Sequence, residues 1–316
     1  MGILEINDLT IRFKTRRGMV NVVRGVDLQI EKGELLGIAG ESGCGKTTTA
    51  LSIPRLLPTN AQVDKGKILF NGQDLMQMTE KEMQGVRWKQ ISVIFQGAMN
   101  ALNPLMTVGK QIVEPLLLHN PKCSKAEAEE KAKHLLEDVG IAASRFNNYP
   151  HEFSGGMRQR VMMAMSLACN PQLVIADEPV TALDVMIQAQ ILALIRKLKA
   201  EYDLSIIMIS HDLSVLSELC DKIAIMYAGR VVEYGRTEDV FLHPYHPYTI
   251  RLMQSYPNIY GDKTFISGIP GYPPDLLDLP VGCPFRSRCR HCSNACCEQE
   301  PKLRDIGGGH YCACVL

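Results

Sequence analysis

The stretch Gly40-Glu41-Ser42-Gly43-Cys44-Gly45-Lys46-Thr47 decides the fold of this chain. It follows the apolar run LLGIAG (35–40) and precedes a predicted helix, TTTALSIPRLL (47–57), which is the context of a phosphate-binding P-loop. The glycines let successive backbone N–H groups turn toward one anion, Lys46 is expected to reach the outer phosphates, and the Thr47 hydroxyl can ligate Mg²⁺. The sequence therefore predicts a nucleotide site, and a glycine-rich turn without a ligand is the alternative.

A second half of the predicted site comes from LVIADEP (173–179). A buried strand would deliver Asp177 and Glu178 side by side at its carboxyl end, and adjacent strand residues point to opposite faces. We therefore expect Asp177 to hold the Mg²⁺ shell and Glu178 to act as the base on a water molecule. A solvated turn is the alternative, but a second apolar run, LSIIMIS (204–210), which ends beside His211, favours the site.

Hydrophobic patterns around these motifs predict an α/β fold. The segments ILEINDLTIRF (3–13) and VVRGVDLQI (22–30) alternate and indicate strands at an antiparallel edge. Two amphipathic helices are predicted, one from a Ser124/Glu127 capping box to Gly140 and one over 185–202. Short apolar runs that follow helical segments indicate a mostly parallel sheet with both faces covered.

The sequence changes character after about residue 236. Two Pro-rich stretches follow, HPYHPYT (243–249) and GIPGYPPDLLDLP (268–280), and neither is expected to form regular helix or inner strand. Of eleven cysteines, four are scattered over the first 280 residues and seven lie between Cys283 and Cys314. This density marks a separate module, and in a reducing compartment it favours a metal site over disulfides.

The composition excludes several classes of protein. Lys and Arg total 34, as do Asp and Glu, so the formal net charge of zero gives no electrostatic reason for binding nucleic acid or an anionic membrane. No run approaches the roughly 18 apolar residues of a spanning helix, and the N-terminus MGILEINDLT lacks the build of a secretory signal. We therefore expect a cytosolic chain that reaches a membrane only through a protein partner.

The segment Phe153-Ser154-Gly155-Gly156-Met157-Arg158-Gln159 resembles the signature motif of ABC transporter ATPases. The resemblance covers about the first 235 residues and includes Gln96 (similar to the Q-loop), residues 181–184 (similar to the D-loop) and His211 (similar to the switch histidine). It implies an ABC-type P-loop ATPase domain over 1–235, with an antiparallel edge sheet and a helical subdomain. Residues 236–316 would form a small Pro- and Cys-rich extension.

The same resemblance implies roles for individual residues. Catalysis would involve Glu178, His211, Gln96 and Lys46, and Mg²⁺ would be held by Thr47, Gln96 and Asp177. In this family two ATP molecules lie between two ATPase domains, and the signature motif of one domain faces the γ-phosphate held by the other. Segment 97–112 would face the coupling helix of a membrane subunit. The residues implied to contact nucleotide are Phe13, Gly40, Glu41, Ser42, Gly43, Cys44, Gly45, Lys46, Thr47, Thr48, Gln96, Ser154, Gly155, Gly156 and Asp184.

Within that family, the extension resembles that of the oligopeptide, dipeptide and nickel importers. The resemblance rests on HPYHPYT (243–249) and on Gly282-Cys283-Pro-Phe-Arg-Ser-Arg-Cys289 with the cysteines that follow. It implies a [4Fe–4S] cluster, and structural zinc and free thiols are the alternatives. Cys292, Cys297 and Cys312 depart from the pattern as extra cysteines. The cysteines that match it are Cys283, Cys289, Cys296 and Cys314.

The implied function is that of an ATP-hydrolysing subunit that powers import of oligopeptides, dipeptides or a related solute such as nickel. Its implied partners are a second ATPase subunit in a heterodimer, two membrane permease subunits and, indirectly, an extracytoplasmic solute-binding protein, with no nucleic acid. It would lie peripherally on the cytoplasmic face of the cell membrane. The alternatives are a soluble ABC ATPase that acts in DNA repair or translation, and a regulatory protein whose ATPase fold is vestigial.

Overall fold

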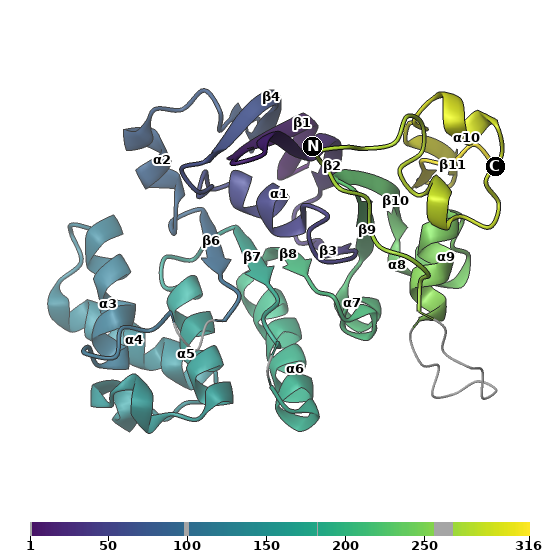
Figure 1. Cartoon of the computed structure of the whole chain (residues 1–316). Coiled ribbons are helices and arrows are strands. Elements are labelled where there is room, and N and C mark those ends of the chain that lie inside the picture. Colours follow the sequence, from purple (N-terminus) through teal and green to yellow (C-terminus); the bar gives the residue numbers. More distant parts are fainter. Residues whose placement is uncertain (1, 98–100, 182, 256–267) are drawn as a thin grey trace. The chain divides into compact units, whose positions relative to one another are not determined.

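The computed structural model describes residues 2–97, 101–181, 183–255 and 268–316. They form two units (Figure 1). The first comprises Met1–Ile30, Leu35–Met76 and Ser210–Leu316, and the second comprises Glu31–Glu34 and Gln77–Ile209. The P-loop lies in the first unit and the Asp177–Glu178 pair lies in the second.

An antiparallel sheet opens the first unit. Its strands are β1 (Leu4–Thr15), β2 (Gly18–Ile30), β4 (Ala61–Phe70) and β5 (Gln73–Asp74), in the order β2-β1-β4-β5. Alternate residues of β1 are buried, Leu4 and Ile6 before a register shift and Leu9 and Ile11 after it, which is the pattern of a sheet with one face on the core. The predicted antiparallel strands are therefore confirmed.

A second set of strands in the first unit carries the P-loop. β3 (Leu35–Ala39) is buried along its whole length and runs parallel to β9 (Lys222–Tyr227). β10 (Arg230–Arg236) pairs antiparallel with β9, and the extension adds β12 (His310–Cys312) and β11 (Arg304–Gly307) beside it. The helices α1 (Lys46–Ser52) and α7 (Leu213–Leu219) complete this region.

Residues after 236 contain more helix than the sequence predicts. The helices are α8 (Thr237–Leu242), α9 (Pro247–Gln254) and α10 (Ala295–Glu298), with one 3-10 turn at Arg286–Arg288. The prediction that HPYHPYT excludes helix is wrong, because Pro247 occupies the first turn of α9, where its missing N–H costs nothing. Residues 268–280 contain neither helix nor strand, as predicted.

A buried carboxylate attaches the extension to the first unit. Glu233 of β10 is 0% exposed and accepts hydrogen bonds from the backbone N–H groups of Tyr245 (2.7 Å) and His246 (2.9 Å). His310 Nε2 lies 2.8 Å from the same carboxylate. The extension thus lies in the unit of the P-loop, and the predicted boundary near residue 236 remains a prediction.

The second unit combines three parallel strands with helices (Figure 1). The strands β8 (Ser205–Ile209), β7 (Leu173–Asp177) and β6 (Ile91–Ile94) lie in that order, and β7 and β8 are entirely buried. The predicted capping box opens α4, and Gly140, with a φ of +76°, follows its end. The helices are α2 (Glu80–Val86), α3 (Val108–His119), α4 (Lys125–Asp138), α5 (Gly155–Leu167) and α6 (Val185–Tyr202).

Among the described residues, no helix has both the length and the apolar character needed to span a membrane.

Candidate nucleotide site and cysteine cluster

The P-loop takes a backbone path that only glycine allows at two of its positions. Gly40 has a φ of +147°, and a Cβ atom there would lie 2.2 Å from the Met226 carbonyl oxygen. Gly45 has a φ of +102°, and its Cβ would lie 2.7 Å from the Val22 oxygen. Both close approaches bring the loop against neighbouring backbone, so the glycine spacing is a steric requirement here.

Lys46 holds the loop from inside. Its ammonium donates to the carbonyl oxygens of Gly40 (2.7 Å) and Glu41 (3.0 Å), and the residue is only 8% exposed. Thr47 is exposed in the first turn of α1, where its hydroxyl is available to a metal ion, and Thr48 is half-buried. Cys44 is buried, and burial raises the pKa of its thiol, so its side chain serves to fill space in the loop.

Two further predicted residues lie in the same unit as the P-loop. Ser210 donates its backbone N–H to the Ile38 carbonyl of β3 (3.4 Å), so His211 directly follows a residue that bonds to the strand leading into the P-loop. Phe13 is half-buried in β1, opposite Val20 of β2 and Ala61 of β4. Its contact with the nucleotide, which the family resemblance implies, stays a prediction.

The second unit brings Glu178, the predicted base, together with Gln96. Glu178 Oε2 accepts hydrogen bonds from Gln96 Nε2 and from Thr181 Oγ1, both at 2.9 Å. Asp177 ends the buried strand β7 and is 3% exposed. The carboxylate expected to activate water is therefore oriented by two side-chain donors, one of which is the glutamine expected to take part in catalysis and to hold Mg²⁺.

The physical reason given for the Asp177–Glu178 pair needs correction. Strand alternation does not apply to Glu178, because β7 ends at Asp177 and Glu178 has a φ of +50°. Its backbone N–H donates to Ile209 at 2.9 Å, which fixes this left-handed turn. A non-glycine residue in this region is conformationally costly, and such residues concentrate at functional sites.

The signature motif forms the start of α5. Ser154 is exposed at the N-cap, and its hydroxyl accepts from the Met157 N–H at 3.4 Å. Gly156 is buried, and a Cβ there would lie 2.5 Å from the Ile187 side chain, so this glycine permits α5 to pack on the first turn of α6. Gly155 is half-buried between them along the chain. A hydroxyl and helix-terminal N–H groups thus stand together at one helix end, as an anion requires.

The predicted D-loop leads into α6. Asp184 is the N-cap of this helix, and its carboxylate accepts from the Ile187 N–H at 3.0 Å. Val185 and Met186 follow it and are 80% and 72% exposed, which is unusual for large apolar side chains. Ala182 of the D-loop and residues 98–100 of the predicted coupling segment lie outside the described residues.

Four of the predicted cluster cysteines gather in the extension. Burial raises the pKa of Cys283 to about 11, and the neighbouring thiols act in the same direction. The Cys283 N–H donates to the Cys296 carbonyl at 2.8 Å, and Gly282, with a φ of +82°, allows that approach. At Cys296 burial acts to raise the thiol pKa, but hydrogen bonds from Ser293 and Cys292 outweigh it and lower the pKa. The thiols that influence Cys283 are those of Cys296, Cys314 and Cys289.

The extra cysteines behave differently from these four. Cys312 is 0% exposed in β12, and burial followed by the charge of Glu233 raises its pKa. Cys292 and Cys297 are exposed. Four thiols fit the donor set of a cluster or of zinc, yet within the described part of the chain no three metal-ligating side chains are arranged to bind an ion. The predicted cluster is therefore not a preformed site in this structure.

Two regions of the chain match known protein families. Residues 23–181 match the ABC transporter family, and residues 232–296 match the C-terminal region of oligopeptide and dipeptide transporters. The oligopeptide transport ATP-binding protein OppD of Salmonella typhimurium is 48% identical over 314 residues, covering 99% of this chain and 93% of the relative. The dipeptide transport ATP-binding protein DppD of Bacillus subtilis is 45% identical over 317 residues, covering 99% and 94%.

The chain belongs to the ABC transporter ATP-binding family, in its oligopeptide and dipeptide branch. The predicted family is thus confirmed, and the C-terminal match speaks against a soluble ABC ATPase of DNA repair or translation.

Solved structures of ABC ATPases support the same fold. The ATP-binding cassette MJ0796, in a dimeric post-hydrolysis state with ADP and Pi, matches with a TM-score of 0.67 and 27% identity over 74% of this chain and 98% of that one. The protein cbiO1 from Clostridium perfringens, part of a cbiONQ complex, matches with a TM-score of 0.67 and 26% identity over 77% and 91%. The predicted α/β ABC ATPase fold is confirmed, with its antiparallel sheet and helical subdomain.

The buried pairing of two charged residues of this ABC ATPase, Glu233 and Arg288, was not predicted from the sequence. Glu233 stands in the apolar strand sequence VVEYG, and a carboxylate among buried residues was a usable signal that it must be paired. Arg288 is 6% exposed and pairs with Glu41 of the P-loop. No local signal identifies that pair, because its members are 247 positions apart.

Proposed function

We propose that this ABC ATPase hydrolyses ATP to power the uptake of oligopeptides or dipeptides, or of a related solute such as nickel. The observation that carries the proposal is the Glu178 carboxylate held by Gln96 and Thr181, in a chain whose C-terminal region is of the peptide-transporter type. An oriented carboxylate is what a general base requires, which favours an active ATPase over a vestigial one.

The residues divide the chemistry between them. The P-loop N–H groups and Lys46 bind the phosphates, and Glu178 accepts a proton from the attacking water. Thr47, Gln96 and Asp177 are the residues proposed to hold Mg²⁺, which would supply positive charge to stabilise the phosphates during hydrolysis. His211 is proposed to contact the γ-phosphate, because it directly follows Ser210, whose backbone N–H bonds to the P-loop strand β3 within the first unit.

A second ATPase subunit is the proposed partner for the surface around the signature motif. Ser154 and Asp184 cap the helices α5 and α6, and exposed Val185 and Met186 begin α6. Exposed apolar side chains beside polar helix caps suit a protein interface better than solvent. The proposed partner would place its own P-loop opposite Ser154, so that two ATP molecules are shared.

A groove on the helical subdomain is the proposed contact for a membrane subunit. Its volume is about 680 Å³, and apolar side chains of α3 line it with charged residues at its edge. Leu118 in this lining is 71% exposed, and Leu105, which precedes the lining residue Met106, is 86% exposed. A helix with apolar and charged sides would cover these groups, and the chain would then lie peripherally on the cytoplasmic face of the membrane. The lining includes Met106, Lys110, Val113, Glu114, Leu117 and Phe146.

Uptake by cells that lack the gene tests the function. The original chain is expected to restore uptake of a labelled tripeptide, whereas Glu178→Gln, produced at the same level, is not. Co-purification from membranes should recover a second ATPase and two permease subunits. Recovery of ribosomal or nucleic-acid partners alone would reject the transporter proposal, and restored nickel uptake without peptide uptake would change the solute.

We also propose that the four gathered thiols bind a [4Fe–4S] cluster that clamps the extension, with zinc as the alternative ligand. The support is that the thiols of Cys289, Cys296 and Cys314 act to raise the pKa of Cys283, and those of Cys296 and Cys314 act to raise the pKa of Cys289. Anaerobically purified protein should show the visible absorbance of a cluster and contain iron, and Cys296→Ser should lose both. Cys123→Ser, in the other unit, is the control. Colourless protein with zinc would select the alternative, and protein with neither metal would contradict the proposal.

A further inference from the structure

The C-terminal extension contacts the P-loop at Glu41. The guanidinium of Arg288 donates to both carboxylate oxygens of Glu41, at 2.6 Å and 2.8 Å, as a two-pronged ion pair. The side chain of Arg288 is 3% exposed and that of Glu41 is 24% exposed. Glu41 also donates its backbone N–H to the hydroxyl of Tyr248 in α9, at 2.9 Å. Residues far along the chain thus hold both the side chain and the backbone of one P-loop residue.

Arg288 is itself held on several sides, by residues of the extension and by Tyr227 of β9. Its Nε donates to the Pro270 carbonyl at 2.9 Å, and its NH1 lies 3.3 Å from the Tyr227 hydroxyl. The guanidinium carbon lies 5.8 Å from the ring centres of Tyr227 and Phe285. A planar guanidinium that is fixed on several sides can orient the carboxylate it binds, which a mobile surface arginine cannot do.

Glu41 transmits this restraint to the phosphate-binding lysine. Its carbonyl oxygen accepts from Lys46 Nζ at 3.0 Å, while its N–H and its side chain are held by Tyr248 and Arg288. Every polar group of Glu41 is therefore engaged, two by the extension region and one by Lys46. The conformation of the loop around Lys46 depends on contacts that lie more than 200 positions away.

We propose that Arg288 is a positioning residue for ATP binding: through Glu41 it holds the P-loop in the shape that receives the phosphates. Arg288 is not catalytic, because its guanidinium is committed to Glu41. The inference rests on ATP binding by the P-loop and makes no use of the transported solute or of a metal on the cysteines. It gives the extension a role in nucleotide affinity.

Simple electrostatics and positioning predict opposite changes in ATP affinity for the substitution Glu41→Gln. Glu41→Gln removes a negative charge beside the phosphate site, which by charge alone should tighten ATP binding. Positioning predicts the reverse, because a glutamine offers one acceptor oxygen to a guanidinium that needs two, and the loop loses its restraint. The sign of the change in ATP affinity therefore separates the two explanations.

The experiment measures ATP binding by the full-length chain together with KM and kcat of ATP hydrolysis. Arg288→Gln and Glu41→Gln are each expected to weaken ATP binding about tenfold, with kcat at saturating ATP changed by less than about threefold. The double variant should be no weaker than either single variant, because the two residues act as one unit. Arg288→Lys should recover only part of the affinity, since an ammonium lacks the fork.

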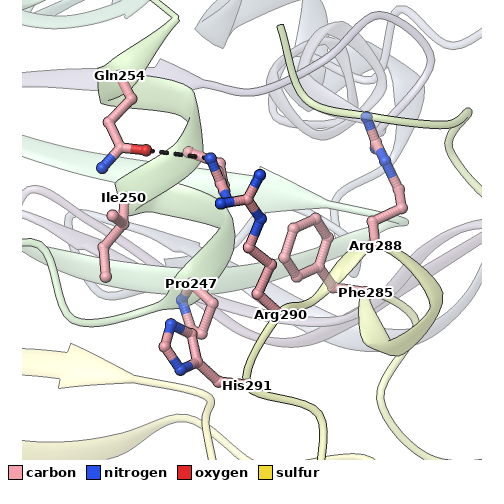
Figure 2. A pocket seen from close by; sticks show the side chains of 8 residues that line it. Pro247, Ile250, Gln254, Phe285, Arg288, Arg290 and His291 are labelled. Atoms are coloured by element: carbon pink, nitrogen blue, oxygen red, sulfur yellow. Dashed lines mark hydrogen bonds between the residues drawn. The ribbon is translucent and has the colours of Figure 1, made fainter. Parts of the chain in front are cut away.

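Arg290→Gln is the matched control. Arg290 flanks Cys289 on the other side from Arg288 and is exposed, so the substitution removes the same charge equally close to the cysteines. Figure 2 shows the two arginines on opposite sides of Phe285, with Arg290 on the wall of a pocket of about 290 Å³ beside α9. This variant should bind ATP within about twofold of the original chain.

Three outcomes would overturn the proposal: unchanged ATP affinity in folded Arg288→Gln, tighter ATP binding by Glu41→Gln, or equal losses in Arg288→Gln and Arg290→Gln. If Arg288→Gln does not fold, Glu41→Gln still decides, because its sign is diagnostic. An original chain that binds no ATP at all would instead contradict the proposed function, which keeps the two failures distinct.

Discussion

The P-loop and the C-terminal extension belong to one unit but are stabilised in different ways. In the P-loop, Lys46 bonds to Gly40 six positions away, and the glycines supply the backbone conformations. In the extension, His310 reaches Glu233 across 77 positions, Arg288 reaches Glu41 across 247, and Glu300 reaches Arg24 across 276. The nucleotide motif is thus locally determined, whereas the extension depends on buried charges that meet only in the folded chain.

Because of this difference, we expect substitutions in the nucleotide site to affect activity and substitutions in the extension to affect stability. Side chains of the nucleotide site, such as Glu178 and Ser154, are partly open to solvent, so their loss should reduce activity more than folding. The extension buries Glu233, His246 and Arg288, whose loss leaves a buried polar partner unsatisfied. Substitutions in the two regions should therefore affect different measurements, and the contacts of Glu41 with Arg288 and Tyr248 should link them.

Glu178→Gln should give the largest effect on activity. The amide cannot accept the proton of the attacking water, so kcat should fall about 100-fold or more. It can still accept from Gln96 and Thr181, so ATP affinity and the free energy of unfolding should stay close to their original values. Phosphate release and urea unfolding measure the two effects. Glu201→Gln, an exposed change in the same unit, is the control, and hydrolysis at the original rate by Glu178→Gln would remove the assignment of the base.

Glu233→Gln should give the largest effect on stability. The carboxylate accepts from two backbone N–H groups and from His310, and one oxygen of the amide would be replaced by a donor. Loss of one member of a buried pair costs about 3 to 5 kcal/mol of unfolding free energy. Limited proteolysis should cut the extension first, and the exposed Glu238→Gln should change little. Destabilisation of both variants by the same amount would show that burial of Glu233 is not what matters.

The same contrast explains how much the sequence could predict. The P-loop, the signature serine and the capping box at Ser124 were readable because each bond joins residues a few positions apart. The left-handed turn at Glu178 was not, since it depends on the Ile209 carbonyl of another strand. Helix α9 was missed because proline was taken as a helix breaker, although it is acceptable in a first turn.

The contacts within the extension could not be predicted from the sequence. Which cysteines gather could be suggested by resemblance, but the separation of Cys312 into β12, opposite Glu233, depends on a strand pairing with β10. The partner of Arg288 could not be identified, because nothing near residue 41 marks its glutamate as the acceptor for a distant arginine. Long-range charge pairs are selected by the packing of whole segments, which short patterns do not encode.

The pH dependence of stability should report on His246. Burial lowers its pKa to about 4, and its Nδ1 accepts the N–H of Tyr248 as the cap of α9, which requires the neutral ring. Because the folded pKa lies below the unfolded value of about 6.5, stability is complete above pH 6.5 and falls as the pH drops toward 4. At pH 5.5 the contribution of this residue should be a loss of roughly 1 kcal/mol.

Urea unfolding at several pH values checks the His246 prediction. His246→Asn keeps an acceptor for the helix cap but does not titrate, so it should flatten the dependence between pH 6.5 and 5. His243→Asn, an exposed change at the end of α8, is the matched control and should leave the slope of the original chain. An unchanged slope in His246→Asn would assign the pH dependence to other groups.

Substitutions of Ser154 should give the smallest effect. They test most closely whether chemistry and stability are separate, because Ser154 has both a structural and a proposed chemical role. Its hydroxyl caps α5, so Ser154→Ala should cost about 1 kcal/mol of stability, whereas Ser154→Asp keeps a cap acceptor and a favourable charge at the helix start. For ATP hydrolysis in the assembled transporter the order should differ: serine fastest, alanine slower and aspartate slowest, since a carboxylate would repel the γ-phosphate. If hydrolysis followed the order of stability, with aspartate above alanine, Ser154 would act as a helix cap alone.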